Sequence, residues 1–348
     1  MENERAIFEM GKQSIKLPMP VYIRASASVV GKKEKEGPLG HLFDIASTDD
    51  QFGQKNWEDS ESELQKQAVN KVLEKAEMKW EQIRYLFAGD LLGQGIATAF
   101  GLKDLGIPLF GLYGACSTCG EALSLGAMAI GGGFAGNVVC VTSSHFASAE
   151  KEFRFPLEYG GQRPPSSTWT VTGSGAFVLS AHPGKAPRAI ITGITTGKIE
   201  DYGIHDSMNM GCAMAPAAMK AIEANLKDFG RTPSDYDRII TGDLGSVGKE
   251  ALIALLKEKG INIEAVHMDC GIEMYDLQKQ GVGAGGSGCG CSASILSAVL
   301  LDKLERGEWK RILFLPTGAL LSKTSYNEGK NVMGIAHGVV IESLGITR

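Results

Sequence analysis

Two cysteines stand in glycine-rich segments at places where helices are expected to begin. Cys116 and Ser117 follow a Gly-Ala pair, and Cys289 ends a Gly-Gly-Ser-Gly-Cys segment that contains Ser287. The start of a helix carries unpaired N–H groups and a partial positive charge, so it attracts anions and favours a thiolate. If the two segments meet, they predict a central site for an anion or for a developing oxyanion.

Further polar residues extend this candidate ligand-binding site. Asp243 and His145 each come shortly after a predicted strand, and His337 lies inside the last one. Arg154 and Tyr159 belong to a loop rich in glycine and proline beside the first cysteine. We expect Arg154 to bind a carboxylate of the ligand, with a solvated surface arginine as the alternative.

The secondary structure that positions these residues is expected to alternate between helices and strands. In 57–80, Leu64, Ala68, Val72 and Ala76 recur at a helical spacing. Short apolar strands without polar alternation indicate sheets that helices cover on both faces. We expect further helices at 117–130, 214–229, 249–259 and 292–306, and strands at 83–88, 109–112, 138–143, 177–181, 189–195, 238–241, 265–268, 311–315 and 335–342.

An internal repeat indicates the architecture. Asp90 and Asp243 both lie in a Gly-Asp-Leu sequence that follows a strand, and Cys116 and Cys289 occupy comparable places before a helix. The members of the first pair are 153 positions apart and those of the second pair 173. Two pairs in the same order indicate a duplication, with an insertion of about twenty residues between them in the second copy. Capping of the following helix is the alternative role of both aspartates.

Composition excludes several classes of protein. The net charge of −5 over 348 residues argues against a nucleic-acid-binding face. The seven cysteines are spread thinly, as in a protein with reduced thiols. Cys116 and Cys119 form a single Cys-x-x-Cys without a second one, so we expect no metal site. No dinucleotide or phosphate-loop motif is complete, so we expect no cofactor.

One long segment without charge raises the question of a membrane span. Residues 122–149 contain no charged side chain, but Gly131, Gly132, Gly133 and Gly136 interrupt them. The interruption predicts a buried helix, a glycine turn and a buried strand rather than a transmembrane helix. Charged residues also interrupt the first 21 residues, so no signal peptide is expected.

Several motifs resemble known families. Tyr113-Gly-Ala-Cys-Ser-Thr before a small-residue helix, in a duplicated α/β chain, resembles the thiolase and ketoacyl synthase superfamily. A closer resemblance, to the stage V sporulation protein AD family, extends over about 31–342. It is carried by blocks that include Lys33-Glu-Lys-Glu-Gly-Pro-Leu-Gly, Arg154-Phe-Pro-Leu-Glu-Tyr-Gly-Gly-Gln, Ala284-Gly-Gly-Ser-Gly-Cys and Ile335-Ala-His-Gly-Val-Val.

The resemblance implies a fold and a function. The fold would have two thiolase-like halves, 1–185 and 186–348, in five layers, α-β-α-β-α. The protein would bind dipicolinic acid, free or as its calcium chelate, and take part in its uptake into the forespore and its release on germination. It would lie at the spore inner membrane as a peripheral protein, held by integral membrane proteins of the same transport complex. The superfamily also implies a homodimer, formed across the strand at 138–143.

The residues at the two cysteine segments favour binding over catalysis. Condensing enzymes of this superfamily pair the nucleophile with two His residues, or with His and Asn, to bind the thioester oxygen and move protons. Asp243 stands where one of these groups is expected, and an ionised carboxylate cannot donate to an oxyanion. We therefore expect a non-catalytic protein in which Cys116 is a vestigial nucleophile. The alternatives are an acyl-CoA condensing enzyme or acyltransferase that uses Cys116, and a structural scaffold without a ligand.

Overall fold

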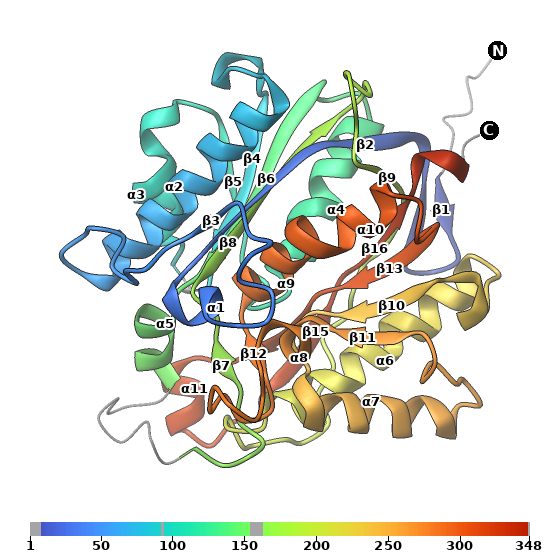
Figure 1. The fold of residues 1–348 in the computed structure, drawn as a ribbon. Coiled ribbons are helices and arrows are strands. Elements are labelled where there is room, and N and C mark those ends of the chain that lie inside the picture. The colour runs from blue at the N-terminus through green and yellow to red at the C-terminus, as the bar shows by residue number, and fades with distance from the viewer. Residues whose placement is uncertain (1–7, 92–93, 154–162, 347–348) are drawn as a thin grey trace.

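The strands of the two halves form two similar sheets, which backbone pairing joins into one twelve-stranded sheet (Figure 1). The structure is a computed structural model that describes residues 8–91, 94–153 and 163–346. The first-half strands are β2 (Ser14–Val30), β4 (Tyr85–Asp90), β5 (Leu109–Gly111), β6 (Asn137–Ser144) and β8 (Gly173–Ser180). The second-half strands are β9 (Ala189–Thr195), β10 (Arg238–Thr241), β11 (His267–Asp269), β13 (Arg311–Leu315) and β16 (Gly338–Glu342).

The order and direction of the strands repeat between the halves. The first sheet runs β5-β4-β6-β8-β2 and the second β11-β10-β13-β16-β9, so equivalent strands take equivalent places. In each sheet the first two contacts are parallel and the next two antiparallel. The antiparallel pair β2–β9 joins the sheets. The predicted duplication of an α/β unit is therefore confirmed.

Helices complete five layers around these sheets (Figure 1). The outer layer of the first half consists of α2 (Trp57–Ala76) and α3 (Ile96–Leu102), and that of the second half of α6 (Met210–Asp228) and α7 (Gly245–Glu258). The central layer contains α4 (Thr118–Gly131) and α9 (Cys289–Ile295), which continues through a π-helical turn, Leu296–Leu300, into α10 (Leu301–Glu305). Three apolar cores lie between successive layers, and the central one contains side chains of α4, α9 and both sheets.

Shorter elements complete the fold. They are β1 (Glu9–Met10), α1 (Lys32–Lys35), β3 (Ile45–Ala46), α5 (Phe146–Phe153), β7 (Trp169–Thr170), α8 (Cys270–Met274), β12 (Gly286–Ser287), β14 (Thr317–Leu320), α11 (Lys323–Asn327) and β15 (Met333–Ala336). The pairs β7–β12 and β14–β15 each form a small two-stranded sheet.

Three elements differ from the sequence expectations. The longest strand, β2, was not expected, because its Lys-Leu-Pro-Met-Pro stretch is unlike a regular strand; the pairing with β9 shifts register there, between Lys16 and Val21. The expected strand 335–342 is two strands, β15 and β16, which separate at His337 and enter different sheets. The expected helix 57–80 ends at Ala76, where Glu77 adopts a left-handed conformation.

The expected strand 177–181 begins earlier than predicted. The glycine-rich residues 173–176 before it are already part of β8. Gly175 faces α9, and a Cβ there would lie 2.5 Å from the backbone carbonyl carbon of Ala293. Only glycine lets the central helix pack this closely on the strand. The absence of side chains therefore serves sheet–helix packing here rather than a turn.

The long segment without charge is a helix, a glycine turn and a strand, as predicted. It comprises most of α4, the turn 132–136 and β6. Among the described residues no helix is long and apolar enough to cross a bilayer. Both edges of β6 are already paired, with β4 and β8, so this strand has no free edge for the expected dimer contact at 138–143, and the homodimer stays a prediction.

Candidate functional site

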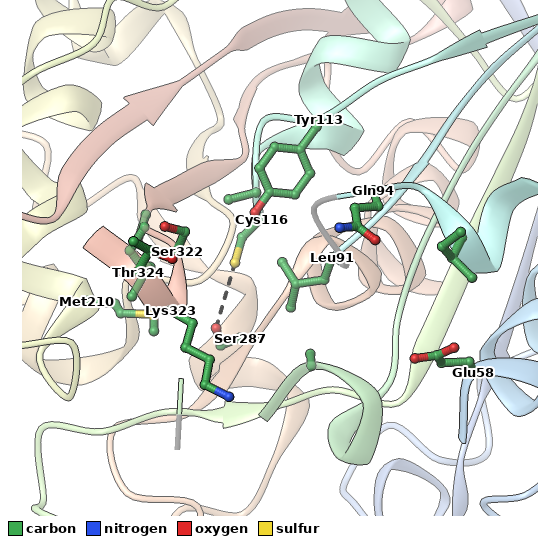
Figure 2. Close-up of a pocket in the computed structure, with 15 residues that line it drawn as sticks. Glu58, Leu91, Gln94, Tyr113, Cys116, Met210, Ser287, Ser322, Lys323 and Thr324 are labelled. Carbon is green, nitrogen blue, oxygen red and sulfur yellow. Dashed lines mark hydrogen bonds between the residues drawn. The ribbon is translucent and has the colours of Figure 1, made fainter. Parts of the chain in front are cut away.

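A cavity of about 530 Å³ lies between the halves, above the beginnings of α4 and α9. Cys116 and Ser287 form its floor (Figure 2), and Ala115, which precedes Cys116, also lines it. The remaining lining residues come from both halves: Glu58, Leu91, Gln94, Ile96, Tyr113, Ala149, Met210, Ala319, Leu321, Ser322, Lys323 and Thr324. Its volume is within the range of small-molecule sites.

The turn before α4 places Cys116 at the bottom of the cavity. Ala115 has a φ of +50°, a left-handed conformation that costs a non-glycine residue about 1 kcal/mol or more. The hydroxyl of Ser117 donates to the Gly114 carbonyl at 2.6 Å and closes the turn. Gly318 of β14 supports it from the second half, since a Cβ at this position would lie 2.3 Å from the Gly114 oxygen. Ser117 thus shapes the turn and is buried below the cavity.

The two cysteine segments meet, as the sequence predicts. The Cys116 Sγ lies 3.8 Å from the Ser287 Oγ, and the two residues belong to different halves. Figure 2 shows this contact directly beneath the Tyr113 ring. The juxtaposition gives the cavity a floor built by both copies of the duplicated unit.

Asp243 organises the floor from below. Its Oδ2 accepts hydrogen bonds from the Gly288 backbone N–H at 2.9 Å and from the Ser287 hydroxyl at 3.2 Å, and its Oδ1 accepts from the Thr317 hydroxyl at 2.7 Å. The helix-capping role is wrong for Asp243, because the amides at the start of α7, on Leu244 before the helix and on its first residue Gly245, donate to Asp269 instead.

Asp90, the first-half counterpart, does hold a helix. Its Oδ2 accepts from both the backbone N–H and the hydroxyl of Thr98 in α3, at 2.8 and 2.7 Å. The two equivalent aspartates have therefore taken different roles, one in a helix start and one in the cavity floor.

The environment of Cys116 favours the thiol over the thiolate. Burial raises its pKa well above the ordinary value of 9.0, and the Asp243 carboxylate raises it further. Hydrogen bonds from the Ser287 side chain and the Gly288 backbone act in the opposite direction and are smaller effects. Burial also raises the pKa of Asp243, while its hydrogen bonds act against that rise.

The other predicted site residues lie outside the cavity lining. Cys289 is fully buried, and its thiol donates to the Ser143 carbonyl at 2.8 Å. The His145 Nε2 lies 2.8 Å from the Asp50 carbonyl, and its ring packs on Trp57 at a centroid distance of 5.4 Å.

His337 lies at the break between β15 and β16, also outside the lining. Its Nδ1 accepts from the Gly197 N–H at 3.2 Å, and burial lowers its pKa to about 4, so the ring is neutral at pH 7. Arg154 and Tyr159 lie outside the described residues.

Several cavity residues carried no sequence signal. Lys323 begins the short helix α11, and Figure 2 shows its side chain extending along the cavity wall on the Ser287 side. Tyr113 covers Cys116, and burial raises its pKa to about 12, so it remains a neutral donor. The Glu58 carboxylate forms an ion pair with Lys151 at 3.2 Å. The one sequence signal for Tyr113 is its position directly before the Gly-Ala-Cys segment.

No group of three or more potential metal ligands occurs among the His, Cys, Asp and Glu side chains that the structure describes. Cys119 is buried in α4 within the central core, so the Cys-x-x-Cys spacing places its two thiols in different surroundings. The cavity lining therefore combines a neutral thiol, hydroxyls, Lys323 and the Lys151-paired Glu58, above the buried Asp243 carboxylate.

Comparisons with known proteins agree in both sequence and fold. A family model described as Stage V sporulation protein AD matches residues 11–342. The Stage V sporulation protein AD of Bacillus subtilis (strain 168) is 43% identical over 335 residues, covering 96% of this chain and 98% of that protein.

Solved structures of condensing enzymes share the fold at low identity. The 3-oxoacyl-[acyl-carrier-protein] synthase III from Aquifex aeolicus VF5 superposes with a TM-score of 0.55 at 17% identity, over 92% of this chain and 99% of that one. Human mitochondrial 3-ketoacyl-CoA thiolase in complex with CoA gives a TM-score of 0.57 at 13% identity, over 94% and 99%. These likenesses show a thiolase-like fold.

Proposed function

Because the chain belongs to the Stage V sporulation protein AD family, we propose that it binds dipicolinic acid, free or as the calcium chelate, in the cavity above Cys116. In this proposal it takes part in the uptake of dipicolinic acid into the forespore and in its release on germination. It acts there without catalysing a reaction, on a thiolase-like scaffold.

The bonding of Asp243 is the observation that carries the non-catalytic assignment. An oxyanion hole needs donors aimed at the cavity. Here the Ser287 hydroxyl and the Gly288 N–H both donate to the Asp243 carboxylate, so neither is directed at a bound thioester. The raised pKa of Cys116 also leaves little thiolate at neutral pH, and the thiolate is the nucleophilic form.

The polar groups for a small dianion such as dipicolinate lie in the cavity walls, whereas the floor lies above the Asp243 carboxylate. Asp243 repels a second negative charge, so we expect the ligand carboxylates to lie towards Lys323 and the Thr324 and Tyr113 hydroxyls. One cation with a few hydroxyl donors is the arrangement that a dicarboxylate needs, and charge-assisted hydrogen bonds are the strongest of these.

Calorimetric titration of the full chain with dipicolinate tests the binding proposal. We expect saturable heat, with and without calcium. Isophthalate provides the matched control, because it carries the same two carboxylates without the ring nitrogen. Absence of saturation at millimolar dipicolinate would rule the proposal out.

An acyltransferase that uses Cys116 remains the second candidate, since the Cys116 thiol lies on the cavity floor at a helix start, after the strained Ala115. Incubation with acetyl-CoA or malonyl-CoA, followed by intact-mass measurement, separates the two functions. A stable acyl adduct that disappears in Cys116→Ala would establish the enzyme and exclude the non-catalytic proposal.

We further propose that the protein lies peripherally at the spore inner membrane, held by integral membrane proteins of the same complex. Salt washing of isolated membranes should then release it without detergent.

The proposed homodimer forms through β5 rather than β6. Among the described strands β5 pairs only with β4, and its Leu109 and Phe110 are 44% and 51% exposed. Such an edge is open to pairing with a second copy.

A further inference from the structure

A chain of hydrogen bonds behind the first-half wall of the cavity converges on Glu61 of α2. This carboxyl group is completely buried. The Ser143 Oγ at the end of β6 lies 3.0 Å from its Oε1, and the Ser148 Oγ of α5 lies 2.6 Å from its Oε2. Glu61 thus connects α2 to β6 and α5, which follow each other more than sixty residues later in the chain.

The number of available protons decides which form of Glu61 can make all of these hydrogen bonds. The Ser148 Oγ also lies 3.2 Å from the His145 carbonyl, and a hydroxyl has one proton to donate. If Glu61 is ionised, Ser148 must donate to the carboxylate and loses its bond to His145. If Glu61 is protonated, it donates to the Ser148 oxygen, and Ser148 donates to the carbonyl.

The other carboxyl oxygen is satisfied in both states. The Gln65 Nε2 donates to the Ser143 hydroxyl at 3.2 Å, and Ser143 in turn donates to Glu61 Oε1. Only the neutral acid makes every one of these contacts at once. Hydrogen-bond geometry therefore assigns Glu61 as a buried carboxylic acid.

The charged and titratable groups around Glu61 act in the same direction. Asp90 at the end of β4 and Glu58 on α2 are both carboxyl groups and oppose a further negative charge. The Cys289 thiol of α9 is neutral because its own pKa is well raised, and burial of His145, before α5, lowers the pKa of its ring. Lys151 of α5 is paired with Glu58. No cation among these described groups is placed to compensate an ionised Glu61.

The residues that Glu61 holds are immediate neighbours of the cavity lining. Ala149, which lines the cavity, follows Ser148, and its backbone N–H donates to the His145 carbonyl at 3.0 Å. Glu58, also in the lining, lies one helical turn before Glu61 on α2. A change in the hydrogen bonding of Glu61 therefore acts on Ser148 and α2, which carry the lining residues Ala149 and Glu58.

We propose that Glu61 is a proton-controlled latch: the closed wall holds it as a neutral acid between α2, β6 and α5, and its ionisation places an uncompensated charge there. The charge is relieved when α5 moves away, admits water and opens the first-half side of the cavity. The latch goes beyond the proposed function, because it concerns the motion of the wall whatever ligand the cavity binds. The titration supports it, since burial first and Asp90 second raise the pKa of Glu61 to about 8.

The direction of the pH effect follows from proton binding. The closed state holds the proton more tightly than a solvated Glu, whose pKa is 4.5. The stability of the closed wall is therefore complete below about pH 4.5, falls as pH rises towards about 8, and is constant above it. Because one group titrates, the equilibrium constant for opening changes by at most about tenfold per pH unit.

Amide hydrogen exchange of the full chain from about pH 6 to about pH 9 tests the latch, after correction for the intrinsic rate. We expect the protection of α5, read at Ala149, to fall by up to about tenfold per pH unit until it levels near the pKa of Glu61. In Glu61→Gln, which keeps the shape of the neutral acid, protection should not change with pH. Glu63→Gln, on the same helix, should behave as wild type.

A flat wild-type profile, or an unchanged slope in Glu61→Gln, would overturn the latch. If Glu61→Gln does not fold, Glu61→Leu removes the titrating group at similar volume and provides the same comparison. A dipicolinate titration at each pH forms a separate arm, in which wild-type affinity varies with pH and that of Glu61→Gln does not. Failure of dipicolinate to bind at any pH counts against the proposed function, whereas the exchange data alone decide the latch.

Discussion

Replacing Asp243 by Asn should make Cys116 more reactive. The change removes a negative charge from beneath the thiol and keeps the size of the side chain. The amide oxygen can still accept from the Gly288 N–H, and its NH₂ group can donate to the Thr317 oxygen. We therefore expect the fold to be retained while the pKa of Cys116 falls.

The size of the effect follows from the distances. The Ser287 Oγ lies 3.8 Å from the Cys116 sulfur and 3.2 Å from the Asp243 Oδ2. The two charges are thus at most about 7 Å apart, and at an effective dielectric constant of about 20 they repel by at least about 2 kcal/mol. This corresponds to a fall of about 1.5 units in the pKa of Cys116.

Alkylation by iodoacetamide, followed by peptide mass spectrometry to isolate Cys116 from the other six cysteines, measures this pKa. Below the pKa, Asp243→Asn should react about 30-fold faster than wild type at the same pH. Asp276→Asn, on an exposed loop, serves as the control and should react like wild type. An unchanged pH–rate profile in a folded Asp243→Asn protein would refute the assignment of Asp243 as the group that suppresses the thiolate.

Three further outcomes are expected. Lys323→Gln should weaken dipicolinate binding about tenfold or more, by loss of a charge-assisted hydrogen bond, while Lys330→Gln, whose lysine pairs with Glu328, should not; equal affinities in calorimetry would remove Lys323 from the site. Gly175→Ala should destabilise the protein by about 3 kcal/mol, because the new Cβ meets α9, whereas Gly136→Ala has open space; equal unfolding free energies in denaturant titration would show that α9 can shift at little cost. Leu109→Lys should convert the proposed dimer to a monomer in sedimentation velocity, and Ile199→Lys, at another exposed apolar residue in the second half, should not; a dimer that survives Leu109→Lys would exclude the β5 interface.

The repeat made much of the fold predictable. The Gly-Asp-Leu and cysteine segments recur in the same order, so equivalent strands and helices could be paired by their sequence alone, and they occupy equivalent places. The long strand β2 escaped prediction because its two prolines disturb the apolar pattern. They lie in the stretch, Lys16 to Val21, over which the pairing with β9 is interrupted.

The site was predictable only where its residues belong to the duplicated segments. Cys116 and Ser287 could be expected to meet because each precedes a central helix of the duplicated unit. His145 and His337 were included for their chemistry, but one ring nitrogen of each contacts a backbone group of a distant segment. No local pattern reveals such partners. Glu61 escaped prediction for the same reason, since it looks like one more glutamate on an amphipathic helix.

The pairing of β2 with strands of both halves has a consequence for how the chain folds. β2 ends at Val30, whereas its sheet neighbours are β8, which begins at Gly173, and β9, which ends at Thr195. During synthesis the first long strand therefore remains without these neighbours until more than half of the chain has been made. Such contacts between distant residues slow folding and leave strand edges exposed to other chains. We expect the nascent first half to depend on chaperones until β9 has emerged, and a fragment that stops before β9 to aggregate.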